Sequence, residues 1–72
     1  MKKVFRICFR HKSNRYGKVV ISAIAQGETW QDAKCTLDYA PLEQKVGHKL
    51  TWHSIYDQED KLVTTLNRER YG

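Results

Sequence analysis

Hydrophobic and polar positions alternate at the start of the chain, over residues 2–10, and again over residues 18–26. The inward-facing positions of the first segment are aromatic or β-branched, namely Phe5, Ile7 and Phe9. A period of two with such residues is typical of a strand that buries one face. Residues 11–17 between the two segments have the composition of a turn. The pattern therefore predicts a β-hairpin over residues 2–26.

At Thr29 the period changes to that of a helix. Thr29 and Asp32 fit a capping box, in which the threonine hydroxyl accepts a hydrogen bond from the backbone N–H of residue 32. Apolar residues then recur at spacings of three and four: Trp30, Ala33, Leu37 and Ala40. We expect a helix over residues 29–40, with Pro41 either ending it or opening a further turn that Gly47 terminates.

Alternation returns in residues 48–57, and residues 62–66 have the composition of a fourth strand. The apolar ends of that last segment are four residues apart, which also suits a short helix. We expect a second hairpin over residues 48–66 and a charged tail, residues 67–72, that frays. One predicted face of the third strand carries Leu50, Trp52, Ser54 and Tyr56.

The order strand–strand–helix–strand–strand predicts one α+β domain over residues 1–72. A ββαββ chain of this kind forms a two-layer domain, with a mostly antiparallel four-stranded sheet and one helix packed on one face. A chain of 72 residues rarely supports two hydrophobic cores. The second face of the sheet is then open to solvent or to a partner.

Charge is distributed unevenly along the chain. Residues 1–27 hold seven lysines and arginines and no acid, whereas residues 28–72 hold six bases and eight acids. Such asymmetry indicates a polyanion or an acidic surface as the partner. The residues expected to bind it lie on the first hairpin: Lys2, Arg6, Arg10, Lys12, Arg15, Tyr16 and Lys18.

The open face predicted for this hairpin interleaves cations with apolar side chains, namely Val4, Cys8, Val20 and Ile24. Cations bind phosphates, and flat or apolar groups contact bases, so a non-catalytic nucleic-acid-binding protein, for DNA or RNA, is the leading interpretation. A small regulator or inhibitor of the phage or plasmid type, docked on an acidic protein surface, is the alternative. In a third interpretation the apolar residues are covered, either by the tail or by a second copy of the chain. Coverage by a second copy gives a homodimer through the open sheet face.

Catalytic signals are weak. Three histidines, His11, His48 and His53, lack the paired spacing of zinc ligands. Two of them, or one with a nearby carboxylate, would make an acid–base pair for a small metal-independent nuclease, which remains a minor alternative. There is no glycine-rich nucleotide fingerprint. We therefore expect no catalytic residue, metal or cofactor.

The longest apolar run, residues 19–25, is too short to span a membrane. Arg6 and Arg10 interrupt the apolar stretch that an export signal requires. We expect a cytoplasmic protein without membrane contact, in which Cys8 and Cys35 are free buried thiols.

The segment from Gly27 to Ala33 (GETWQDA) follows the predicted hairpin. It resembles the strand-to-helix junction of the small HicB-type antitoxins, over about seven of the 72 residues. The resemblance implies the same local topology, a hairpin followed directly by a helix.

Overall fold

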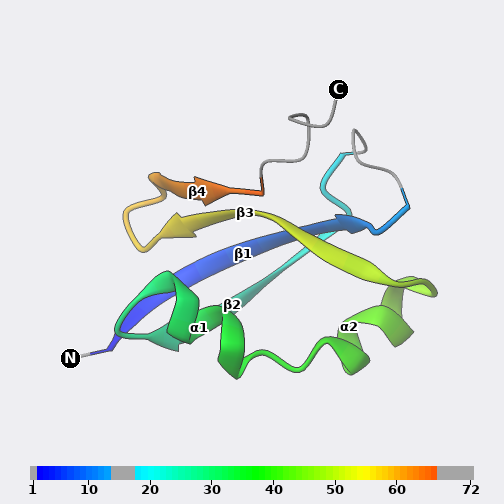
Figure 1. Cartoon of the computed structure of the whole chain (residues 1–72), viewed down its shortest axis with the longest axis horizontal. Helices are drawn as coiled ribbons and strands as arrows, with labels where there is room; N and C mark the ends of the chain where they lie inside the picture. The colour runs from blue at the N-terminus through cyan, green and yellow to red at the C-terminus, as the bar shows by residue number, and fades with distance from the viewer. Residues whose placement is uncertain (1, 14–17, 67–72) are drawn as a thin grey trace.

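The computed structural model describes residues 2–13 and 18–66 (Figure 1). Two predicted binding residues, Arg15 and Tyr16, and the predicted tail lie outside the described residues. The elements, in chain order, are β1 (Lys3–His11), β2 (Ile21–Gly27), α1 (Trp30–Thr36), α2 (Tyr39–Val46), β3 (Leu50–Asp57) and β4 (Leu62–Thr65).

The four strands form one sheet in the order β2-β1-β3-β4, and every neighbouring pair is antiparallel. Since β2 and β3 both run antiparallel to β1, they are parallel to each other, and the connection between them carries both helices past β1. Both helices lie on the same side of the sheet (Figure 1). The predicted α+β class and two-layer arrangement are confirmed.

The helical layer consists of two short helices where one helix over residues 29–40 was expected. The backbone of Leu37 adopts an extended conformation (φ −79°, ψ 137°), which ends α1. Asp38 then caps α2, because its side chain accepts a hydrogen bond from the N–H of Ala40 at 3.1 Å. A continuous helix would bring the ring of Pro41 against the carbonyl of Leu37, four residues earlier. Within the first turn of α2 the proline is tolerated, because its missing N–H has no partner there.

The two predicted helix boundaries that depend on local chemistry are confirmed. Thr29 caps α1, and its Oγ1 accepts a hydrogen bond from the N–H of Asp32 at 3.2 Å. Gly47 ends α2 in the left-handed conformation, at φ +85°. A side chain would be strained in that conformation, which is why glycine suits the position.

The core lies between the sheet and the helices. Phe5, Ile7 and Phe9 are buried as predicted, together with Ala25, Ala33, Leu50 and Ile55. Tyr39 of α2 packs edge-on against Phe9, with ring centroids 5.0 Å apart. Trp30 and Trp52 are partly buried at the margin, 5.7 Å apart.

The predicted face of β3 is wrong beyond Trp52. Cys8 of β1 pairs with Ser54, but the next residue, Phe9, pairs with Trp52, so His53 is an extra residue in β3. A bulge of this kind reverses the inward and outward positions that follow it. Ile55 is consequently fully buried in the core, and Tyr56 lies opposite Arg6 on the open face.

Candidate functional site: a basic end of the sheet

The open face of the sheet is organised as rows of paired residues across the strands. One row runs through Ile24, Arg6, Tyr56 and Leu62. The next runs through Ser22, Cys8, Ser54 and Thr65. Ile24 and Leu62, at the two ends of the first row, are 61% and 55% exposed. This face is therefore more apolar and less cationic than the sequence predicts.

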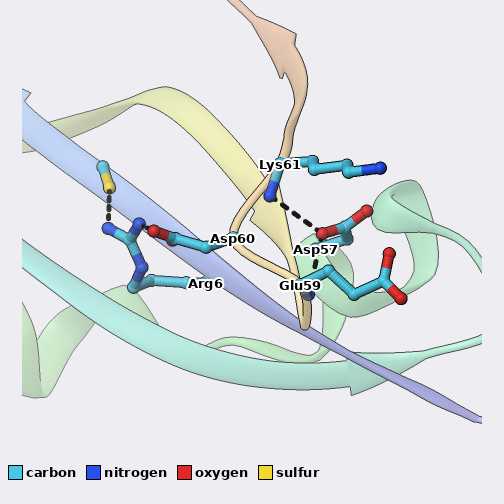
Figure 2. A network of polar contacts seen from close by, with 6 residues as sticks. Arg6, Asp57, Glu59, Asp60 and Lys61 are labelled. Carbon is cyan, nitrogen blue, oxygen red and sulfur yellow. Dashed lines mark hydrogen bonds and ion pairs between the residues drawn. The ribbon is translucent and has the colours of Figure 1, made fainter.

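Arg6 has three intramolecular contacts on this face, of which Figure 2 shows the two made by its terminal nitrogen atoms. Its Nη2 forms an ion pair with Asp60 Oδ1, and its Nη1 donates a hydrogen bond to Cys8 Sγ at 3.3 Å. The guanidinium carbon also lies 4.4 Å from the centroid of the Tyr56 ring, a cation–π distance. The hydrogen bond to Asp60 is the main cause that raises the pKa of Arg6 above its ordinary value. A phosphate would have to compete with this carboxylate for the arginine.

The turn between β3 and β4 holds Asp60 in position. Asp57 Oδ1 accepts hydrogen bonds from the backbone N–H groups of Glu59 at 2.9 Å and Lys61 at 3.0 Å (Figure 2). Asp60 itself is left-handed, at φ +65°, a conformation that aspartate tolerates better than most residues. The acidic turn is thus a structured element that points a carboxylate at β1.

Arg10, the second arginine predicted for the open face, is only 4% exposed. Its guanidinium is therefore not presented at the surface for a phosphate in this structure. Cys8, between the two arginines, is also 4% exposed. The strand β1 does not offer the continuous cationic stripe that its sequence predicts.

Four exposed lysines lie towards the end of the sheet where β1 finishes and β3 begins. The backbone N–H of Lys12 donates to the carbonyl of Lys49 at 3.1 Å, so two lysines from distant segments are neighbours. Next to them the rings of His11 and His48 are stacked, with centroids 3.3 Å apart. We call the exposed lysines of this region the basic end: Lys12, Lys18, Lys45 and Lys49.

Glu43 is the acid that lies against the basic end among the described residues. Its Oε2 accepts a hydrogen bond from the backbone N–H of Leu50 at 3.0 Å, and its Oε1 is 3.7 Å from Lys49 Nζ. The lysine side chain nevertheless remains 81% exposed, whereas that of the glutamate is 21% exposed. An exposed pair at this distance is weak, so Lys49 retains its capacity to bind an external anion.

The acids concentrate at the opposite end of the sheet, in the β3–β4 turn and at the start of α1 (Figure 1). Lys2 lies at this acidic end, because it lines a small surface pocket of about 380 Å³ together with Asp57 and Glu59. Of the predicted binding residues, Lys12 and Lys18 therefore belong to the basic end and Lys2 does not. Sequence reasoning missed Lys49, since only the β1–β3 register brings it beside Lys12.

Within residues 2–13 and 18–66, no group of three or more histidine, cysteine or acidic side chains is arranged to hold a metal ion. His11 and His48 stack face to face near the start of β3, whereas Asp57 ends β3 and Glu59 and Asp60 follow it in the turn to β4. No helix in the described part of the chain is long and apolar enough to cross a membrane.

Comparison with protein-family models, with curated proteins and with solved structures finds no match for this chain. The geometry of the basic end is therefore the basis for a functional argument.

Proposed function

We propose that this protein is a non-catalytic nucleic-acid-binding protein that contacts the phosphate backbone through its basic end. The observation that carries the proposal is the backbone hydrogen bond from the N–H of Lys12 to the carbonyl of Lys49. It makes neighbours of two exposed lysines from different hairpins. Lys18 and Lys45 add further positive charge, and most acids of the described residues, Glu43 excepted among those near the lysines, lie towards the other end. A polyanion would therefore be attracted to one end of the molecule and repelled from the other.

The side chains at this end favour phosphate contacts over base recognition. A lysine ammonium is a compact, mobile point charge that binds phosphate without demanding one geometry. Arginine forms the most specific contacts to guanine, and of the two arginines within residues 2–13 and 18–66, Arg6 is paired with Asp60 and Arg10 is buried. We therefore expect binding with little sequence preference and a steep dependence on salt.

The test compares two double variants with the same change in net charge. Lys12→Glu/Lys49→Glu reverses the charge at the basic end, and Lys2→Glu/Lys61→Glu reverses it at the acidic end. Fluorescence anisotropy with labelled single- and double-stranded DNA and RNA gives the affinities. We expect the first variant to lose binding by about a hundredfold or more, from two lost phosphate contacts and two new repulsions, and the second to lose much less.

Two results would contradict the proposal. Absence of binding by the unaltered protein to all four nucleic acids at low salt would refute nucleic-acid binding. Equal losses in the two double variants would refute the location of the site. The same labelled samples, incubated with and without divalent metal, should remain intact, and cleavage would support the nuclease alternative instead.

A second candidate function, docking on an acidic protein surface, is favoured by the exposed apolar ends of the Arg6 row. Ile24 and Leu62 flank an arginine that can exchange one carboxylate for another. In that case Ile24→Ser or Leu62→Ser would abolish a salt-resistant protein complex. The Lys12→Glu/Lys49→Glu variant would leave that complex intact.

A further inference from the structure

The outer edge of β2 is the most accessible pairing surface of the fold. β2 lies at one end of the sheet, and no strand of residues 2–13 or 18–66 pairs with its outer side. In an edge strand, alternate residues direct their backbone N–H and C=O groups outward. Proteins usually protect such an edge with lysine, proline, a bulge or a very short strand. β2 is seven residues long, reads ISAIAQG and has none of these features.

The opposite edge differs in length, regularity and neighbouring charge. β4 has only four residues, its pairing with β3 is irregular, and Lys61 and the acidic turn directly precede it. Charged residues and irregular pairing discourage the addition of another strand. Of the two edges, β2 is the one that can accept a partner.

Exposed apolar side chains accompany the open edge. Ile24, the middle residue of β2, is the most exposed large apolar side chain of the described chain, at 61%. Val19 and Val20, directly before the strand, are 44% and 42% exposed. A strand added alongside would cover this apolar surface and also satisfy the outward backbone groups.

We infer that β2 pairs with β2 of a second copy of this chain, antiparallel about a two-fold axis at Ile24, to form one continuous eight-stranded sheet. In this register all seven residues of the strand pair across the seam. Ser22 of one protomer lies opposite Gln26 of the other, and the two Ile24 side chains meet on the open face. Shifting the axis by one residue leaves two residues of each strand without a β2 partner.

In the proposed dimer the two copies of α1 are far from the two-fold axis. The helix packs tightly against Gly27, at one end of β2, where a Cβ atom would lie 2.5 Å from the backbone nitrogen of Ala33. A two-fold axis through Ile24 places the two copies of α1 at opposite ends of the paired strands. They therefore lie apart on the helical side of the joined sheet.

The charges of the chain also fit this pairing. Residues 19–27 contain no charged side chain, so no like charges meet at the seam. The antiparallel arrangement sets the basic end of one protomer beside the acidic end of the other, with Lys18 near Glu28. Two chains of net charge +5 would otherwise repel each other. The inference goes beyond the proposed function and does not depend on it.

The first test is sedimentation equilibrium of the full chain over about 1 to 300 µM, a range that covers tight and weak dimers. We expect a dimer of the 8.5 kDa chain. Ile24→Lys places two cations at the centre of the seam and should weaken the dimer at least tenfold. Leu62→Lys, the matched control, adds the same charge at a similarly exposed position on β4 and should leave the dimer intact. A monomer at every concentration, or equal effects of the two variants, would overturn the inference.

The second test fixes the register by disulfide cross-linking. The background is Cys8→Ser/Cys35→Ser, because Cys35 is exposed, not buried as the sequence predicts, and Cys8 lies directly opposite Ser22 on β1, within reach of a cysteine placed there. Ile24→Cys should cross-link to itself under mild oxidation. Ser22→Cys should not cross-link to itself, but it should cross-link when mixed with Gln26→Cys. Equal yields for all three combinations, or none for Ile24→Cys, would contradict pairing about Ile24. These variants leave Lys12 and Lys49 unaltered, so the result is independent of nucleic-acid binding.

Discussion

Gly27 and Gly47 are both glycines at the end of an element, and the structure predicts that they respond differently to alanine. At Gly27 an added Cβ would lie 2.5 Å from the backbone nitrogen of Ala33, 2.9 Å from Asp32 Cβ and 3.0 Å from Ala33 Cα. Two of these atoms belong to the backbone of α1 and cannot rotate away. At Gly47 nothing lies within 4 Å of the added Cβ, but the backbone is left-handed at φ +85°.

The loss of stability in each alanine variant can be calculated from its cause, a steric clash at Gly27 and backbone strain at Gly47. Forcing an extra carbon into a packed junction typically costs about 1–3 kcal/mol, and rigid backbone neighbours place Gly27→Ala at about 3 kcal/mol. A left-handed conformation costs an alanine about 1 kcal/mol relative to glycine. For a domain of this size, each kcal/mol lowers Tm by about 4–8 °C. We therefore expect Gly27→Ala to lower Tm by about 12–24 °C and Gly47→Ala by about 4–8 °C.

Thermal and urea denaturation, monitored by circular dichroism, gives the Tm and the free energy of unfolding of both variants. Gly47→Asn is the control for conformation, because asparagine tolerates the left-handed region and should recover part of the loss. A Gly27→Ala variant that melts within a few degrees of the unaltered protein would refute the close packing of α1 on β2. So would a smaller loss for Gly27→Ala than for Gly47→Ala.

Further variants test the helix cap of α1, the inward and outward positions of β3, and the partly buried phenol of Tyr39. Thr29→Ala removes the acceptor for the N–H of Asp32 and should lower the free energy of unfolding in urea by about 1 kcal/mol. Ile55→Ala should cost about 2–5 kcal/mol, more than Tyr56→Ala, and the reverse order would contradict the bulge in β3. Burial is the main cause that raises the pKa of Tyr39, so the folded state favours the neutral phenol and its stability falls as pH rises above about 10. Tyr39→Phe should therefore lose less stability between neutral and strongly alkaline pH, and identical pH profiles for the two proteins would contradict this assignment.

The parts of the fold that were predictable from sequence depend on neighbouring residues. Alternation placed Phe5, Ile7 and Phe9 in the core, because residues two apart on a strand always share a face. The cap at Thr29 was predictable for a similar reason, since a hydroxyl reaches an N–H only three residues away. The break before α2 was only partly foreseen, through Pro41, because the capping role of Asp38 was not recognised.

The parts that were not predictable depend on strand pairing. Ile55 was placed on the wrong face because the bulge at His53 exists only in the register between β1 and β3. The same register brings Lys49 beside Lys12, which no local pattern indicates. Arg6 and Asp60 are 54 residues apart in the chain, so their ion pair could not be inferred from spacing. The charge asymmetry of the first 27 residues thus pointed to a basic surface, and the pairing of the strands defined where it lies.

The measurement that tests the proposed function most directly is the slope of log affinity for duplex DNA against log salt concentration. Each lysine–phosphate contact contributes about −0.9 to this slope, so two contacts weaken binding about twelvefold between about 50 and 200 mM salt. We predict that Lys12→Gln/Lys49→Gln has a slope shallower than that of the unaltered protein by about 1.8. An unchanged slope in this double variant would contradict phosphate binding at the basic end.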